Sequence, residues 1–232
     1  MRVEPHTIDS IVHAVKRGAR GQPIVRDVHD QQRFARLLYY LNDEYRDEYW
    51  ERSLDGLQAF ARPEHWPERA PLVKVLAWTL MSNHLHLVLK ELREGGIAKF
   101  MQKVCGSMTM HFNAKYSEQG SIFQGSYRGR TVELHGDEYL RYLAVYVMVK
   151  NPFELFPGGL TRATEHFEEA YLWATRYPFC SLGTYATESQ SPIVDKDIFG
   201  ELFETPDHFK NFARECMEYK LDQLKEFEFG QV

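Results

Sequence analysis

The chain has 232 residues, of which 44% are hydrophobic and 26% charged, a composition typical of a folded globular protein rather than a disordered one. No run approaches the roughly 18 to 20 apolar residues that a membrane span needs, and the first residues lack a secretory apolar stretch, so we expect a cytoplasmic protein with no membrane partner. The net charge of −5 does not exclude a nucleic-acid partner, because segment 161–232 has twice as many acidic as basic side chains and the rest is net positive.

The first half of the chain alternates strand and helix patterns. Residues 11–16 alternate apolar and polar side chains and end at a glycine loop, which predicts a strand, and Asp30 caps a helical pattern that runs to about residue 44. The largely apolar run 73–81 predicts a strand that is buried on both faces. A turn at 82–83 leads into a further strand over 84–89, so these two runs predict a β-hairpin.

The next segment contributes two helices and a strand. Apolar residues at helical spacing predict a helix over 96–116, and 128–134 alternates like a strand. A helix that begins near residue 136 should end at Asn151-Pro152, because the residue before proline avoids helical geometry. This element order predicts an α+β fold, a ferredoxin-like split βαβ sandwich with a mainly antiparallel sheet.

The chain is expected to contain one sandwich domain and one extension. We assign residues 8–160 to the sandwich domain, and residues 161–232 to an acidic helical C-terminal extension that packs on it. Helical patterns over 165–177 and 206–227 flank an irregular stretch in that extension. Three widely spaced cysteines without a paired motif predict free thiols.

Two histidines are the first candidates for chemistry. His84 and His86 are two residues apart on a predicted strand, so both imidazoles project from one face, whereas the intervening leucines project from the other. Such a pair can bind a divalent cation, but it is an incomplete site that needs a third ligand from elsewhere. Two histidines packed on a half-buried strand explain the same pattern.

Three tyrosines are candidates for a nucleophile. Tyr139, Tyr142 and Tyr146 form one stripe of the helix that follows the fourth strand. A phenol has a pKa near 10, so it attacks only with a neighbouring base or a cation that stabilises the developing charge. An aromatic core stripe is the alternative for each of them.

Five ordered motifs resemble those of the single-tyrosine HUH transposases, specifically the REP-associated tyrosine transposases of the insertion-sequence-200-like superfamily. The match spans roughly residues 8–186, and its motifs are Ile11 to Gly18, Ser82 to Leu89, Ser121 to Tyr127, Tyr146 to Pro152 and Tyr177 to Leu182. In the last motif, Cys180 stands where the family has a serine.

The resemblance implies a transposase that cleaves and rejoins single-stranded or hairpin DNA. It implies that His84 and His86 bind Mg²⁺ or Mn²⁺ and that Tyr146 attacks the scissile phosphate, which gives a 5′-phosphotyrosine and a free 3′-hydroxyl. Family members are monomers or dimers, so a homodimer is one expected form. Charge and position select candidate DNA contacts, namely Arg17, Arg20, Lys99, Lys103, Arg128 and Arg130. Gln124 is a further candidate, and a glycine-flanked polar turn into the strand explains this residue equally well.

The chain departs from the family at one spacing. The family's tyrosine and metal-binding asparagine are four residues apart, whereas Tyr146 and Asn151 are five apart, which on a regular helix places them on different faces. We therefore expect either a one-residue bulge that restores Asn151 as the third ligand, or a third ligand from elsewhere. Because of this departure, a second function is also possible: a domesticated relative that binds DNA hairpins but does not cut them. A third is a phosphodiesterase, in which the bound metal activates a water molecule instead of the tyrosine.

Overall fold

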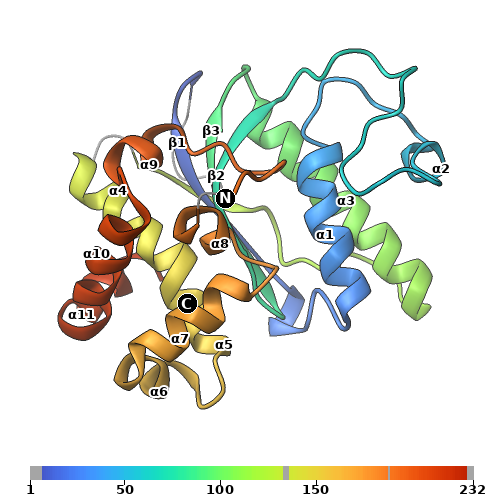
Figure 1. Ribbon diagram of the computed structural model, residues 1–232. Helices are drawn as coiled ribbons and strands as arrows, with labels where there is room; N and C mark the ends of the chain where they lie inside the picture. The colour runs from blue at the N-terminus through green and yellow to red at the C-terminus, as the bar shows by residue number, and fades with distance from the viewer. Residues whose placement is uncertain (1–6, 133–135, 188, 229–232) are drawn as a thin grey trace.

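The computed structural model describes residues 7–132, 136–187 and 189–228 (Figure 1). Its centre is a four-stranded sheet with the strand order β2-β3-β1-β4, in which every neighbouring pair is antiparallel. The strands are β1 (Ile11–Arg17), β2 (Val73–Leu80), β3 (His84–Glu91) and β4 (Arg128–Thr131). The two central strands are therefore β1 and β3, and both candidate histidines lie on β3.

Helices cover both faces of the sheet. In Figure 1, α1 (Val28–Tyr40) and α3 (Gly96–Tyr116) lie on one side, and α4 (Gly136–Val145) and α10 (Pro206–Tyr219) lie on the other. The remaining elements are α2 (Trp50–Ser53), α5 (Asn151–Leu155), α6 (Gly159–Glu165), α7 (Phe167–Arg176), α8 (Leu182–Ala186), α9 (Asp197–Leu202), α11 (Leu221–Leu224), the 3₁₀ turns η1 (Ala19–Gly21) and η4 (Lys225–Phe227), and the π-helical turn η3 (Tyr146–Lys150).

The element order and the sheet order together confirm the predicted fold class. A helix connects β1 to β2, a tight turn connects β2 to β3, and a second helix connects β3 to β4, which is the ferredoxin-like arrangement. The two connecting helices, α1 and α3, pack on the same face of the sheet. This leaves the opposite face for α4, which follows β4, and for the C-terminal helices.

The alternation along β3 determines which face each side chain meets. Leu85, Leu87 and Leu89 are fully buried in the core beneath α1 and α3, whereas Val88 belongs to the core on the α4 side. Because side chains on a strand alternate between faces, His84 and His86 lie on one face, as predicted, and this is the face that α4 covers.

The C-terminal helices share a core with the sheet. Phe167, Tyr185 and Phe209 belong to the same buried cluster as Leu76 and Val88 of the sheet. The C-terminal helices and the sheet thus share one buried core, and the division into a domain over 8–160 and an extension over 161–232 stays a prediction. None of the helices in the described ranges combines the length and apolar character needed to cross a membrane. The three cysteines are free thiols, as predicted.

Several predicted boundaries were wrong. The helix predicted over 206–227 ends at Tyr219, because Lys220, with φ −131° and ψ 26°, leaves helical geometry and the chain turns into α11 and η4. The stretch 178–205, which was predicted to be irregular, contains the helices α8 and α9. Both are too short to give a periodic apolar pattern in the sequence. The fourth strand is observed to Thr131, and the rest of the range predicted for it includes residues outside the described ones. The helix also fails to end at Asn151-Pro152 and continues to Leu155.

Candidate active site

The aromatic rings of both predicted histidines and of Tyr146 lie together on the α4 side of the sheet. The ring centroids of His84 and His86 are 4.9 Å apart, and those of His86 and Tyr146 are 5.3 Å apart. A third imidazole, His13 of β1, lies 5.3 Å from His86 and 5.9 Å from Tyr146. The site thus combines three imidazoles and one phenol from two strands and the η3 turn.

His13 enters the site through the register of the sheet. In the pairing of β1 with β3, Val15 lies opposite His86 and His13 lies opposite Val88, so His13 is the diagonal neighbour of His86 on the same face. The His13 Nε2 and His86 Nδ1 atoms are 3.0 Å apart, within hydrogen-bond distance. The sequence reasoning missed His13, because its place on the strand becomes informative only when the register is known.

The ring of His84 is oriented by its neighbour in the chain. His84 Nδ1 lies 2.7 Å from Asn83 Oδ1, and the other end of the Asn83 amide donates to the Gly21 carbonyl at 3.2 Å. That second bond fixes the Asn83 oxygen as the acceptor, so His84 donates from Nδ1. The Nε2 atom of His84 then carries a lone pair, which is the form that binds a metal.

Burial keeps the imidazoles neutral. Loss of solvent, with a smaller effect of Arg130, lowers the pKa of His13 to about 3. Loss of solvent also lowers the pKa of His84 to about 4, with added effects of Arg17 and Lys150, and lowers the pKa of His86 well below its usual value. Near neutral pH each ring therefore has one nitrogen free of a proton.

These pKa values predict acid-sensitive stability. In the unfolded chain the imidazoles titrate near 6.5, so between pH 6.5 and about 4 the unfolded state binds more protons than the folded state. The free energy of unfolding should therefore fall as the pH is lowered from 7 to 5, measured by urea denaturation in EDTA. The His13→Gln variant lacks one of these groups and should lose less over the same range; an equal loss would show that His13 does not contribute.

The helix that carries Tyr146 contains the predicted one-residue bulge. The Asn151 backbone N–H donates to the Tyr146 carbonyl five residues earlier, and residues Tyr146–Lys150 form a π-helical turn. In a regular helix this bond joins residues four apart. The extra residue therefore gives Asn151 the place relative to Tyr146 that a residue four positions later has on an ordinary helix.

Tertiary hydrogen bonds support this π turn. Pro152 has no N–H to donate, and the turn shifts the bonding pattern, so carbonyls at 147 and 148 need other partners. The Thr79 hydroxyl donates to the Val147 carbonyl, and the Cys180 thiol donates to the Met148 carbonyl at 3.5 Å. This explains why the helix passes through Asn151-Pro152 although the local sequence predicts its end.

Removing the Thr79 hydroxyl should destabilise the protein. Thr79 is completely buried, so Thr79→Val preserves the shape of the side chain but leaves the Val147 carbonyl without its donor. We expect the free energy of unfolding to fall by about 1–3 kcal/mol in urea denaturation. Thr79→Ser retains a hydroxyl and should lose less, and equal losses in both variants would contradict the role of this hydrogen bond.

Tyr146 is covered by the C-terminal segment. Its side chain is 3% exposed, and the ring of Phe227 packs on it. The ring centroid of Phe227 is 5.5 Å from that of Tyr146 and 4.8 Å from that of Tyr139. Burial raises the pKa of Tyr146 above its usual value, and the carboxylates of Glu228 and Glu154 add to the rise. In this arrangement the phenol is protonated and shielded.

Lys150 links the covering segment to the π turn. Its ammonium lies 5.1 Å from the centre of the Tyr146 ring and forms ion pairs with Glu154 at 2.6 Å and Glu228 at 2.9 Å. A third ion pair joins Arg130 of β4 to Glu226 at 3.7 Å. The segment 226–228 is therefore attached to both sides of the site by charge as well as by the Phe227 ring.

Two buried polar atoms of these elements have no hydrogen-bond partner among the described residues. His86 Nε2 and Asn151 Nδ2 are buried atoms without a hydrogen-bond partner, and the oxygen and nitrogen of an amide exchange places by rotation. Among the described residues, no three His, Cys, Asp or Glu side chains are grouped so that they could hold a metal. A third protein ligand from this part of the chain would thus be of another type, and Asn151 is a suitable one.

The candidate DNA contacts separate into two groups. Arg17 lies opposite His84, while Arg128 and Arg130 of β4 lie opposite Val15 and His13, so these three arginines share the face of the site. Exposed Arg20 lies in η1 and exposed Gln124 in a loop, both near the end of β1, and the Gln124 N–H donates to the Arg17 carbonyl at 2.9 Å. Lys99 and Lys103 belong to α3 on the other side of the sheet, where Lys103 donates to the Asp43 carbonyl at 2.6 Å.

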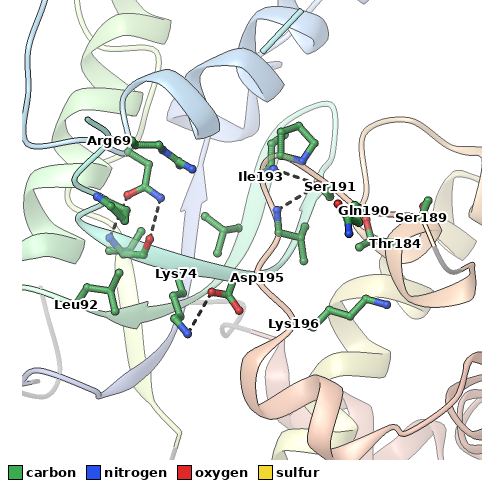
Figure 2. Close-up of a pocket in the computed structure, with 16 residues that line it drawn as sticks. Arg69, Lys74, Leu92, Thr184, Ser189, Gln190, Ser191, Ile193, Asp195 and Lys196 are labelled. Atoms are coloured by element: carbon green, nitrogen blue, oxygen red, sulfur yellow. Dashed lines mark hydrogen bonds and ion pairs between the residues drawn. The ribbon is translucent and has the colours of Figure 1, made fainter. Parts of the chain in front are cut away.

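A large cavity lies apart from this site. Figure 2 shows it at the beginning of β2, beside segment 189–196, with a volume of about 650 Å³. Lys74 points into this region and forms an ion pair with Asp195 at 3.1 Å. The lining includes neither the histidines nor Tyr146, because Thr79, at the other end of β2, is the residue opposite His86.

Comparison with known proteins finds one family model that is similar to part of the chain. Residues 68–148 match the model of the family described as "Transposase IS200 like". No curated protein matches the chain significantly. A solved structure of a REP-associated tyrosine transposase bound to a REP hairpin has a TM-score of 0.45 and 10% identity, over 85% of this chain and 93% of that one. The segment that is similar to the IS200-like transposase model contains His84, His86 and Tyr146.

Proposed function

We propose that the protein is a metal-dependent endonuclease and strand transferase that acts on single-stranded DNA beside a hairpin. The observation that carries this proposal is the convergence of His84, His86 and Tyr146 on one face of the sheet. A phenol is a weak nucleophile, so its place beside two neutral, metal-competent imidazoles is the feature that a phosphotyrosine mechanism requires.

The residues have separate roles in the proposed site. His84 and His86 would hold Mg²⁺ or Mn²⁺ through their Nε2 atoms, and the Asn151 amide oxygen would be the third protein ligand. When bound, the cation supplies Lewis-acid polarisation of the scissile phosphate. The π turn would place Asn151 in line with Tyr146, so that one helical turn carries both the nucleophile and this ligand.

In the cleavage step one phosphate ester bond replaces another, so the phosphate remains a diester. The Tyr146 oxygen loses its proton and forms a bond to phosphorus, while the bond from phosphorus to the 3′-oxygen breaks and that oxygen takes up a proton. The products are a 5′-phosphotyrosine and a free 3′-hydroxyl. Attack by the 3′-hydroxyl of another strand reverses these bonds and transfers DNA without an external energy source.

The basic face provides the DNA contacts in this proposal. Arg17 and Arg128 are exposed on the face that carries the histidines, so they are placed to contact phosphates that flank the scissile one. Arg20 and Gln124 extend that surface. Lys99 and Lys103 on α3 would contact only a separate part of the DNA, and a homodimer remains an alternative to a monomer.

One observation favours a second function. Tyr146 is buried beneath Phe227 and its pKa is raised, which is the arrangement expected of a protein that binds DNA hairpins but does not cut them. The asparagine spacing no longer supports this alternative, because the π turn aligns Asn151 with Tyr146. The two functions therefore differ in whether the C-terminal segment moves when DNA binds.

The proposal is tested with a hairpin oligonucleotide that has a single-stranded flank labelled on the 5′ side and, in a second preparation, on the 3′ side. Incubation with Mn²⁺ should transfer only the 3′-side label to the protein, and peptide mass spectrometry should locate it on Tyr146. EDTA should prevent the transfer. Binding without cleavage would support the hairpin-binding function, and cleavage without any adduct would support a hydrolytic phosphodiesterase.

A further inference from the structure

His13 is a buried imidazole whose role does not follow from metal binding or nucleophilic attack. Its side chain is 1% exposed on the central strand β1, and its Nε2 atom is 3.0 Å from His86 Nδ1. The two rings lie nearly parallel, with an angle of 22° between their planes. His13 therefore contacts the Nδ1 atom of His86, whereas the other ring nitrogen of His86, Nε2, has no partner.

The hydrogen bond between the two imidazoles has two possible directions, and they have different consequences for His86. If His86 donates from Nδ1 and His13 accepts at Nε2, the buried Nε2 atom of neutral His86 is a bare lone pair. If His13 donates, the proton of His86 must be on Nε2, where it has no acceptor. A buried nitrogen without a partner is unfavourable in either form, but a lone pair at Nε2 is satisfied when a cation binds, whereas an N–H at Nε2 is not. The first direction is therefore the one that is compatible with metal binding.

The same pattern is present at the neighbouring ligand. His84 donates from Nδ1 to the Asn83 oxygen and thus also keeps its Nε2 atom free of a proton. Histidines that bind metals usually donate their other N–H to such a partner, which fixes both the tautomer and the ring orientation. His86 has a histidine in this place instead of an amide or a carboxylate.

We propose that His13 is a positioning residue that accepts a hydrogen bond from His86 Nδ1 and thereby holds His86 Nε2 ready to bind a divalent cation. This inference rests on the proposed function, since it assigns His86 as a ligand. His13 Nε2 is engaged by this bond and is therefore not available to take the proton of Tyr146. His13 acts on the reaction through His86.

Manganese affinity of the full-length protein tests the inference without DNA or turnover. The signal of free Mn²⁺ in electron paramagnetic resonance gives the Kd at pH 7.5. His13→Phe retains an aromatic ring but has no acceptor, and it should raise the Kd by about 10–100-fold. His13→Gln presents an amide near the place of Nε2 and should restore most of the affinity. His29→Gln removes an exposed histidine of α1 and should leave the Kd unchanged.

The outcomes separate this inference from the proposed function. If the wild-type protein binds Mn²⁺, His86→Ala weakens binding and His13→Phe does not, the role of His13 is wrong and the metal site stands. Equal weakening in His13→Phe and His13→Gln would also overturn it, because the acceptor would then be irrelevant. If the wild type binds no Mn²⁺, or His86→Ala changes nothing, the proposed metal site itself fails.

A measurement on the unmodified chain covers the case in which His13→Phe does not fold. Nitrogen-15 chemical shifts of the imidazoles in the metal-free wild type distinguish the two tautomers, and the His86→Gln spectrum identifies the signals of His86. The inference requires a proton on His86 Nδ1 and none on Nε2. A proton on His86 Nε2 would overturn it.

Discussion

Replacing Tyr146 by phenylalanine should eliminate the covalent protein–DNA adduct. The substitution removes the attacking oxygen but keeps the ring that packs against His86 at 5.3 Å and Phe227 at 5.5 Å, so folding should be preserved. Loss of a covalent nucleophile lowers turnover by as much as about 10⁶-fold in a well-studied hydrolase, which would place any residual adduct below detection. The measurement is adduct formation on a labelled hairpin substrate in Mn²⁺.

The control for this prediction is another tyrosine of the same stripe. Tyr142 lies one turn earlier, and its hydroxyl donates to Glu138 at 3.2 Å instead of facing the histidines. Tyr142→Phe should form the adduct at the wild-type rate. Affinity for the hairpin in EDTA should be unchanged in both variants. Cleavage by Tyr146→Phe at a wild-type rate would mean that water or another side chain is the nucleophile.

Replacing Phe227 by alanine should accelerate adduct formation. The ring of Phe227 is 2% exposed and contacts Tyr146, Tyr139 and His13, so the scissile phosphate reaches the phenol only after this ring moves away. Truncation of a buried phenylalanine lowers the stability of the packed state by about 3–5 kcal/mol, and every 1.4 kcal/mol changes an equilibrium constant by a factor of ten. Because Phe227 lies in a short terminal turn that relaxes easily, we expect a smaller gain of about 10–100-fold in the initial rate.

The matched control is Phe212→Ala in α10. Phe212 packs on Tyr142 and Phe203 and does not contact Tyr146, so this variant loses an aromatic ring from the same C-terminal region without uncovering the site. Its adduct rate should equal that of the wild type. Thermal unfolding of both variants shows whether enough folded protein is present for the comparison. An unchanged or lower rate for folded Phe227→Ala would show that the ring does not limit access.

The local sequence determined the elements and one half of the site. Alternation along 84–89 was sufficient to place His84 and His86 on one face, because the side-chain period of a strand does not depend on its partners. The element order also predicted the ferredoxin-like sheet, because short connections and antiparallel pairing leave few alternatives. The five-residue interval between Tyr146 and Asn151 even predicted a bulge as one of two outcomes.

Only the tertiary structure decided how these parts meet. The π turn exists because Thr79 and Cys180, distant in the chain, donate to the carbonyls that it releases. His13 joins the site because the β1–β3 register makes it the diagonal neighbour of His86, and Phe227 covers Tyr146 because the chain turns at Lys220. Periodicity reports which face of an element is buried, whereas register, chain reversal and hydrogen bonds between distant residues depend on the packing of the whole chain.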